Sequence, residues 1–370
     1  MKNKISYGKI LNEGENMNKG RNKRKKLKVF RLLLFIIIIV IIGIGINQIF
    51  FKDKKQDLGT EVISKNTEHI EDNEKPVITL NGKENKIIVV GNTYIDEKAT
   101  AIDNIDGDIS NKIIVKGDVD TSKIGSYEIT YEVQDEAGNK SETKRTVKVC
   151  NSLQNGIPVL MYHFFYNENE RTAPDNNWLE ISKFEEQIKY LAENDFYMAS
   201  WEEVEEYIDG KVTLPEKTVV ITVDDGDDSF FELAVPVLQK YNINATSFVI
   251  TSWYGHRANK KEKNVSYQSH SDSMHEGGAN GKGVMLSWSY EKIVEDLKKS
   301  NDILGGDATI FCYPFGQYND TDMKALKDAG YKLAFTTESG RVYKGSSKYK
   351  LPRVRIMKTT SFNEFKNMVK

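Results

Sequence analysis

The first concentration of hydrophobic positions is an uninterrupted apolar run, residues 32–51, in which Asn47 and Gln48 are the strongly polar members. A helix of about 20 such residues spans a hydrocarbon core of about 30 Å. A helix buried in a protein core would show a polar stripe, and the stretch 36–42 has none. The run therefore predicts a transmembrane anchor over 32–51. The Lys- and Arg-rich segment 1–31 before it is predicted to stay in the cytoplasm.

The residues after this run favour an uncleaved anchor over a cleaved signal peptide. A signal peptide ends in small residues, whereas the large side chains of Ile49–Phe51 and then Lys52 follow here. We therefore expect a single-pass protein of the cell membrane, with everything from Lys52 onward outside the cell. Residues 52–75 are polar and charged, which predicts a stalk that does not fold alone.

From Pro76 the pattern changes to short apolar runs separated by turn residues. These runs are Val77–Leu80, Ile87–Val89, Ile113–Val115, Tyr127–Val133 and Thr146–Val149. Within residues 127–133 the odd-numbered positions are apolar and the even-numbered ones polar, so one face of the strand is expected to be buried and the other wet. The pattern predicts a small β-sandwich over 76–150.

Residues 156–370 alternate between strand and helix patterns. The apolar strand Thr218–Val223 ends in Asp224 and Asp225, and a helical pattern over Ser229–Tyr241 leads to a second strand at Ala245–Thr251. The same alternation continues in Tyr290–Leu304, Ala308–Tyr313, Asp320–Ala329 and Lys332–Thr336. Parallel βαβ units of this kind predict an α/β fold with a barrel-like parallel sheet. Reactive side chains are expected where its strands end, which is where the two aspartates lie.

Charge and cysteine content limit the classes of function. A formal net charge of −2 gives no reason to expect nucleic-acid binding. The two cysteines, Cys150 and Cys312, are expected to be free thiols. The acidic loop 103–108 offers oxygen ligands, but its spacing is not that of an EF-hand and Ile105 takes the place of a ligand. A solvated turn is the expected structure there.

The five histidines indicate a metal site. Two of them, His270 and His275, are five residues apart, an offset that places them on different faces of a helix but allows joint ligation from a loop. The residues between them have loop composition. Two imidazoles and one carboxylate, with a position open for water, make a catalytic zinc-type set. The alternative for Asp224 and Asp225 is a turn that caps the next helix. His256 is expected in a loop, without a role.

These motifs resemble those of the polysaccharide deacetylase family, whose catalytic part is also called the NodB-homology domain. Thr222–Gly226 matches its Thr-Phe-Asp-Asp-Gly motif, His270–His275 its His-Ser/Thr motif, and Tyr313–Gly316 its Pro-Tyr/Phe-Gly motif. The resemblance runs over 158–370 and implies a distorted β/α barrel. Residues 76–149 resemble the immunoglobulin-like modules of bacterial surface proteins, which implies a spacer or adhesive role.

The resemblance also implies roles for individual residues. Asp224 would be the general base, and Asp225, His270 and His275 would hold one divalent metal ion. Zinc is the expected ion, with cobalt or nickel as substitutes. The backbone at Tyr313 and Pro314 would help to hold the oxyanion, through the N–H groups of that turn.

Departures from the family pattern call for two replacements. The family often has Arg at the position of Cys312, where it orients the base, and Arg353 is expected to supply that guanidinium, with Arg355 as the lesser candidate. A surface arginine is the alternative. The family's usual general acid is a His near the C-terminus, but no His follows His275 here, so His163 is expected to replace it. A packed structural histidine is the alternative for His163.

The resulting expectation is an enzyme that removes the N-acetyl group from N-acetylglucosamine in peptidoglycan, with a cell-wall glycan as its substrate and partner. Three alternatives stay open: a deacetylase of a poly-N-acetylglucosamine exopolysaccharide, a catalytically silent wall-binding protein, and an esterase acting on O-acetyl groups. The five-residue histidine offset resembles the branch that includes poly-N-acetylglucosamine deacetylases. The sequence indicates no protein partner.

Overall fold

A computed structural model describes residues 71–169, 172–278 and 281–370. The predicted cytoplasmic segment 1–31, the predicted anchor 32–51 and residues 52–70 of the predicted stalk lie outside these ranges. Within them, no helix has both the length and the apolar character needed to cross a membrane.

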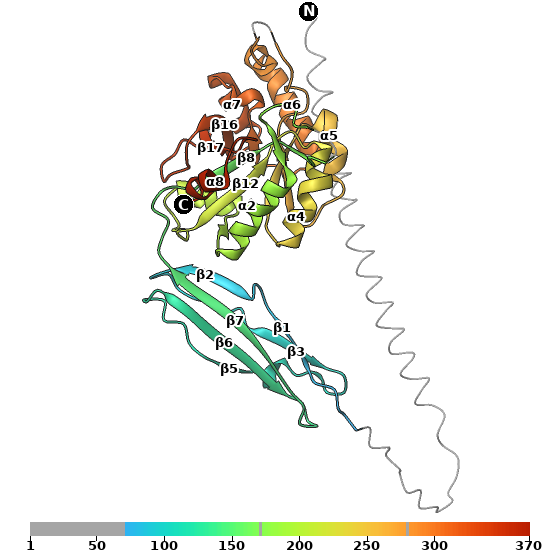
Figure 1. The fold of residues 1–370 in the computed structure, drawn as a ribbon, viewed down its shortest axis with the longest axis vertical. Coiled ribbons are helices and arrows are strands. Elements are labelled where there is room, and N and C mark those ends of the chain that lie inside the picture. Colours follow the sequence, from blue (N-terminus) through green and yellow to red (C-terminus); the bar gives the residue numbers. More distant parts are fainter. Residues whose placement is uncertain (1–70, 170–171, 279–280) are drawn as a thin grey trace, which may run out of the picture. The chain divides into compact units, whose positions relative to one another are not determined.

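The first folded part is a pair of β-sheets (Figure 1). Three strands form one sheet, in the order β1 (Val77–Leu80), β3 (Ala99–Asp103) and β4 (Gly107–Asp108). Four strands form the other, in the order β2 (Asn85–Val89), β7 (Lys140–Cys150), β6 (Gly125–Gln134) and β5 (Ile114–Lys116). Ala99 of the first sheet packs against Ile129 and Tyr131 of the second. The alternation along β6 thus turns one face of the strand into the core, as predicted.

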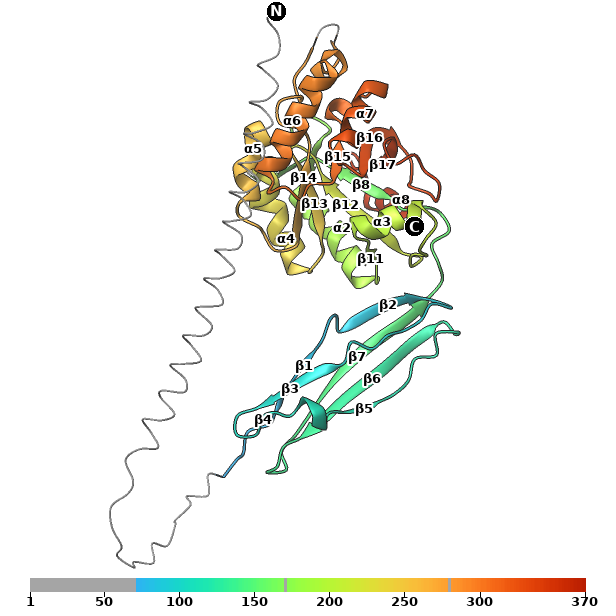
Figure 2. The ribbon, with the colours of Figure 1, turned by 180° about the vertical axis from the view of Figure 1, so that it is seen from behind.

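The second folded part is a closed parallel barrel (Figure 2). Its strands are β8 (Val159–Tyr162), β12 (Thr218–Val223), β13 (Ala245–Val249), β14 (Val265–Ser269), β15 (Ile310–Cys312), β16 (Leu333–Ser339) and β17 (Leu351–Arg355). The first of these strands closes the barrel, because β8 pairs with β12 on one side and with β17 on the other. A short strand, β11 (Tyr197–Met198), is added to β12, and β9 (Phe164–Tyr166) pairs with β10 (Trp178–Glu180) separately. The predicted β/α barrel is confirmed.

Helices cover the outside of this barrel. They are α2 (Ile181–Glu193), α3 (Trp201–Ile208), α4 (Val235–Lys240), α5 (Thr251–Ala258), α6 (Tyr290–Ile303), α7 (Asp320–Asp328) and α8 (Phe362–Met368). All six residues of β12 are buried, which is typical of a parallel strand covered on both faces. The strands are thus covered by the barrel interior on one face and by helices on the other. Their ends are the part of the barrel that can carry a functional site.

Two predictions about helices need correction. The helical pattern over Ser229–Tyr241 is divided into a π-helical turn, Phe230–Ala234, and α4. Pro236 stands in the first turn of α4, where its missing N–H removes one backbone hydrogen bond at the junction with the π-helical turn. His256 lies in the last turn of α5 and not in a loop.

Candidate active site

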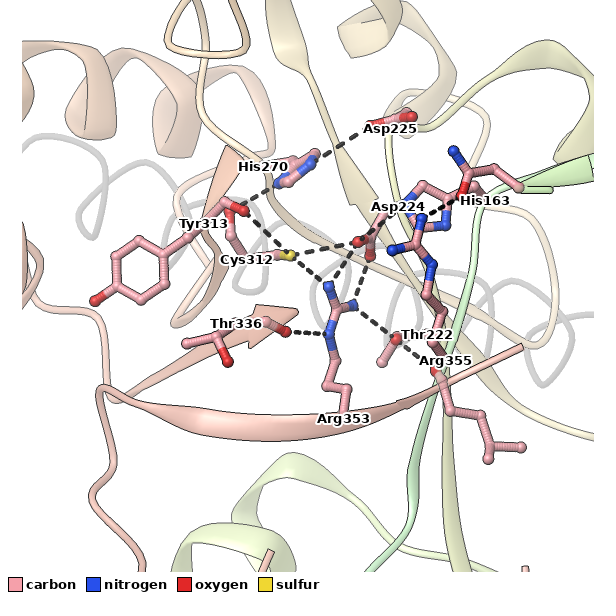
Figure 3. A network of polar contacts seen from close by, with 12 residues as sticks. His163, Thr222, Asp224, Asp225, His270, Cys312, Tyr313, Thr336, Arg353 and Arg355 are labelled. Carbon is pink, nitrogen blue, oxygen red and sulfur yellow. Dashed lines mark hydrogen bonds and ion pairs between the residues drawn. The ribbon is translucent and has the colours of Figure 1, made fainter. Parts of the chain in front are cut away.

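The predicted site residues meet at the carboxyl ends of the barrel strands (Figure 3). His163 follows β8, Asp224 and Asp225 follow β12, and His270 follows β14. Arg353 lies on β17, which reaches the same region from the other side of β8. Residues that are far apart in the sequence thus come together because parallel strands all end at one edge of the barrel.

A sharp turn directs the two adjacent aspartates to different partners. Asp225 has φ 74° and Gly226 φ 81°, both in the left-handed region. A Cβ atom at position 226 would lie 3.1 Å from Cγ1 of Val249, so the turn favours glycine in both conformation and space. The carbonyl of Asp225 accepts a hydrogen bond from the N–H of Ile250 at 3.0 Å. The Asp-Asp-Gly motif therefore determines the backbone turn as well as supplying two carboxylates.

The carboxylate of Asp224 forms a buried, bidentate ion pair with Arg353. Nη1 and Nη2 of Arg353 each lie 2.7 Å from one carboxylate oxygen. The same guanidinium donates to the hydroxyl of Thr222 at 3.1 Å and to the carbonyl of Thr336 at 3.0 Å. Burial would raise the pKa of Asp224, but Arg353 outweighs burial and holds that pKa well below its usual range. Arg353 is fully buried, so the alternative of a surface arginine is wrong.

Cys312 completes the surroundings of this pair. Its Sγ lies 3.0 Å from Nη2 of Arg353 and 3.5 Å from Oδ2 of Asp224. Burial raises the pKa of the thiol. Cys150 and Cys312 are both buried and both free, which confirms the prediction of two thiols. The guanidinium that the family often supplies at position 312 arrives here from β17.

Asp225 faces the two motif histidines. Its Oδ1 lies 3.4 Å from Nε2 of His270 and 3.5 Å from Nε2 of His275, and the three ligand atoms lie within 4.8 Å of one another. That Oδ1 is buried and has no hydrogen-bond partner among the described residues. Asp224, His270 and Cys312 converge equally closely, but the carboxylate of Asp224 is already paired with Arg353.

Both motif histidines present Nε2 to Asp225. Nδ1 of His270 lies 2.7 Å from the carbonyl oxygen of Cys312 and donates to it. Burial would lower the pKa of His270, but Cys312 and Asp225 outweigh burial and raise that pKa, so a cation at Nε2 would take the place of a proton. Burial and the neighbouring His270 lower the pKa of His275 to about 4, so this ring is neutral at physiological pH. An orphaned carboxylate oxygen and two converging imidazole nitrogens fit a divalent ion of the zinc type.

His163 lies next to Asp224 (Figure 3). Its Nε2 is 3.8 Å from Oδ2 of Asp224, and its side chain is 15 % exposed. Burial lowers the pKa of His163, against the opposing effect of Asp224. Nδ1 of His163 is buried and has no partner among the described residues, whereas a histidine that only packs is usually hydrogen-bonded at its ring nitrogens.

The expected oxyanion donors at Tyr313 and Pro314 need correction. The N–H of Tyr313 donates to the carbonyl of Phe335 at 3.0 Å, as part of the pairing between β15 and β16. Pro314 has no N–H. The hydroxyl of Tyr313 is also occupied, because it donates to the carbonyl of Tyr349 at 3.1 Å.

Two exposed aromatic rings beside the site were missed from the sequence. Phe315 is 45 % exposed, has φ 58°, and its ring centre lies 4.4 Å from that of His275. Trp253, on α5, is 51 % exposed, and its ring centre lies 5.8 Å from that of His275. Phe315 belongs to the third motif, so its place in the site could be expected, but the contact with Trp253 depends on the tertiary fold.

Comparison with known proteins agrees with this geometry. The family model for the immunoglobulin-like domain of bacterial surface proteins matches residues 78–149, and that for polysaccharide deacetylases matches residues 211–334. The poly-beta-1,6-N-acetyl-D-glucosamine N-deacetylase of Staphylococcus aureus strain MRSA252 is 31% identical over 242 residues, which cover 60% of this chain and 79% of the relative.

Solved structures show the same likeness. A Streptococcus pyogenes deacetylase in complex with acetate is 25% identical, with a TM-score of 0.51 over 58% of this chain and 98% of that one. A polysaccharide deacetylase from Bacillus cereus is also 25% identical, with a TM-score of 0.50 over 67% and 79%. The chain belongs to the polysaccharide deacetylase family. It is an enzyme of that family and carries an immunoglobulin-like domain before its catalytic barrel.

Proposed function

We propose that this enzyme removes acetyl groups from N-acetylglucosamine residues of a poly-β-1,6-linked exopolysaccharide and releases acetate. The observation that carries the proposal is the pairing of two adjacent carboxylates with different partners: Asp225 faces His270 and His275, and Asp224 faces Arg353. The substrate comes from the staphylococcal relative, which acts on that polymer by its name. The expectation of peptidoglycan rested on the predicted anchor 32–51, which lies outside the described residues.

The side chains of Asp225, His270 and His275 would hold one divalent cation. For this cation we propose zinc, with cobalt or nickel as substitutes, because the ligand atoms are two nitrogens and one oxygen. When bound, the cation would supply Lewis acidity and lower the pKa of a water molecule.

Asp224 acts as the general base. Its oxygens are bonded to Arg353, so it stays ionised and outside the cation's ligand set. Because Arg353 holds the pKa of Asp224 low, this carboxylate is a weak base. It therefore accepts a proton readily only from a water molecule whose own pKa the cation has lowered. Turnover should therefore depend strictly on the cation.

His163 acts as the general acid for the departing amine. An amine leaves poorly unless it is protonated, and His163 is the imidazole that lies next to Asp224, at 3.8 Å. The side chain is partly exposed, and its Nε2, which faces Asp224, would pass the proton from that carboxylate to the amine.

The turn after β15 provides the contacts to the substrate. With the N–H of Tyr313 used in the sheet, the next N–H along the turn, that of Phe315, is our candidate donor to the oxyanion. The exposed rings of Phe315 and Trp253 present flat apolar surfaces close to His275, against which the faces of sugar rings would pack.

Acetate release from matched substrates tests the proposal. Purified protein is assayed with poly-β-1,6-N-acetylglucosamine, chitooligosaccharide, peptidoglycan and an O-acetylated glycan. The β-1,6 polymer should give a kcat/KM at least about tenfold higher than the others, which corresponds to about 1.4 kcal/mol of transition-state preference. Preference for peptidoglycan would overturn the substrate, and preference for the ester would overturn the amide chemistry. No release from any substrate would favour a silent glycan-binding protein.

We also propose that residues 32–51 hold the catalytic barrel outside the cell membrane, because the basic segment 1–31 precedes them. Protease added to intact, wall-stripped cells should then remove the barrel and spare the basic segment. Protection of the barrel would show that the orientation is wrong.

A further inference from the structure

Three carboxylates from separate segments converge in the immunoglobulin-like domain. Asp72 precedes β1, Asp103 is the last residue of β3, and Asp135 directly follows β6. One oxygen of each lies within 4.8 Å of the others. Like charges at such distances repel one another, most strongly where water is excluded. Lys112, which lies in the same domain, pairs instead with Asp106 and Glu136, at 3.7 and 3.6 Å.

The environment of Asp103 is a second, independent indication of a bound ligand. It is 4 % exposed, and its Oδ1 accepts hydrogen bonds from the N–H groups of Ile105 and Asp106 at 2.9 and 2.8 Å. Its Oδ2 is buried and has no partner among the described residues. Leaving a buried polar atom unpaired is unfavourable, and more so for a charged one. Asp103 thus has a buried oxygen without a partner among the described residues, and its carboxylate belongs to the cluster of three.

The turn between β6 and β7 holds the carboxylate of Asp135 and the backbone of Asp72 in place. Oδ1 of Asp135 accepts from the N–H groups of Gly138 and Asn139 at 2.6 and 2.7 Å. The side-chain amide of Asn139 donates to Oδ2 of Asp135 at 2.9 Å and to the carbonyl of Asp72 at 3.1 Å. One asparagine thus fixes the segment before β1 against this turn, so the cluster does not depend on side chains that swing freely.

We propose that Asp72, Asp103 and Asp135 form a calcium site. All three ligands are carboxylate oxygens, the donors that Ca²⁺ takes, and the rest of its roughly six to eight ligands would be waters or carbonyls. Zinc is excluded from the proposal because no imidazole or thiolate belongs to the cluster. Asp103 is buried, so the expectation of a solvated turn over 103–108 is wrong for that residue. The EF-hand comparison missed this arrangement because the ligands come from three segments and not from one loop.

Calcium titration by calorimetry, on the full-length protein, tests the site. Wild type should bind one Ca²⁺ per chain with a Kd of about 0.1–1 mM, the range of extracellular modules. Asp103→Asn and Asp72→Asn should each weaken binding by at least about tenfold, because each removes one charged ligand. Asp72→Asn is expected to fold like the wild type, because the amide oxygen can still accept a hydrogen bond from the N–H of Glu74, which lies 3.1 Å from Oδ1 of Asp72. A loss of calcium binding in this variant is therefore not explained by misfolding.

Two control variants make the result decisive. Asp108→Asn makes the same charge change in the same loop, outside the cluster, and should bind like wild type; its oxygen still accepts from the N–H of Ser110, 3.0 Å away. Asp225→Asn disables the cation-facing set of the barrel and should also keep calcium binding. The proposal is overturned if wild type shows no saturable binding up to about 10 mM, tenfold above the weakest extracellular sites. It is equally overturned if Asp72→Asn and Asp103→Asn bind like Asp108→Asn, or if Asp225→Asn abolishes binding.

Discussion

Replacing Arg353 by methionine removes the cationic partner of Asp224, the proposed general base, and keeps a side chain of similar length. The guanidinium makes two contacts of 2.7 Å with Asp224 and further hydrogen bonds to Thr222 and Thr336. Both charged groups are buried. Removing one partner of such a pair costs about 3–5 kcal/mol, because the other charge stays buried without compensation. We therefore expect Arg353→Met to lower the free energy of unfolding by that amount at neutral pH.

The sign of the pH dependence follows from the pKa of Asp224. In the wild type Arg353 holds that pKa below its unfolded value of about 3.9, so the pair stabilises the fold above pH 4 and loses its effect only as pH falls further. In the variant, burial loses its largest opposing contribution, and we expect the pKa of Asp224 to rise above the unfolded value. Ionised Asp224 then destabilises the fold at neutral pH, and its protonation relieves the cost as pH falls. The difference between the two proteins should be largest near neutral pH.

Urea unfolding at several pH values measures this difference, and a double-mutant cycle isolates the pair. Adding Asp224→Asn to Arg353→Met should restore part of the lost stability, because it removes the uncompensated charge. The control is Arg355→Met: Arg355 is exposed and should cost less than about 0.5 kcal/mol. A loss below about 1 kcal/mol for Arg353→Met, or a loss independent of pH, would refute the reasoning.

Three further predictions address the site and the barrel. Asp224→Asn should keep the bound metal but lose most turnover, whereas Asp225→Asn should lose both, as measured by metal content and acetate release; identical behaviour would contradict the separate roles. His163→Ala should lower turnover by about 10²- to 10⁴-fold with metal retained, and an active variant would return His163 to a packing role. Asp322 is buried with an unpartnered Oδ1, and burial raises its pKa to about 6. Its ionisation therefore destabilises the fold above pH 6. The free energy of unfolding, measured in urea at pH 7–8, should be about 1–2 kcal/mol higher for Asp322→Asn than for the wild type. This difference should vanish as pH falls from 6 to 4, and an equal difference at pH 4 would disprove its origin in the ionisation of Asp322.

The sequence predicted the barrel because local patterns determine most of it. Buried parallel strands such as Thr218–Val223 appear as continuous apolar runs, and the helices between them keep a regular period. The division of the helix after Ser229 could not be predicted, since the π-helical turn Phe230–Ala234 keeps an apolar face like that of an α-helix. The number of strands that close the barrel also depends on pairing between distant segments, here β8 with β17.

The candidate site was predictable where motifs carry it and not where the fold does. The residue types and order of Asp224, Asp225, His270 and His275 identify the candidate set from the sequence, and the structure brings these residues together. Backbone hydrogen bonding, in contrast, follows from strand pairing, which is why the use of the Tyr313 N–H in the sheet was missed. The same limitation hid the three carboxylates of the immunoglobulin-like domain, whose segments are brought together by two sheets.

The closure of the barrel by β17 has a consequence for the maturation of the enzyme. The side chains that face the cation, Asp225, His270 and His275, all precede residue 276, whereas Arg353 lies on the last strand to join β8. A chain that folds from its N-terminal end would therefore bring Asp225, His270 and His275 together before Arg353 reaches Asp224. Without β17, Asp224 lacks the guanidinium that holds its pKa below its usual range. The strand that closes the barrel therefore also completes the surroundings of the proposed base.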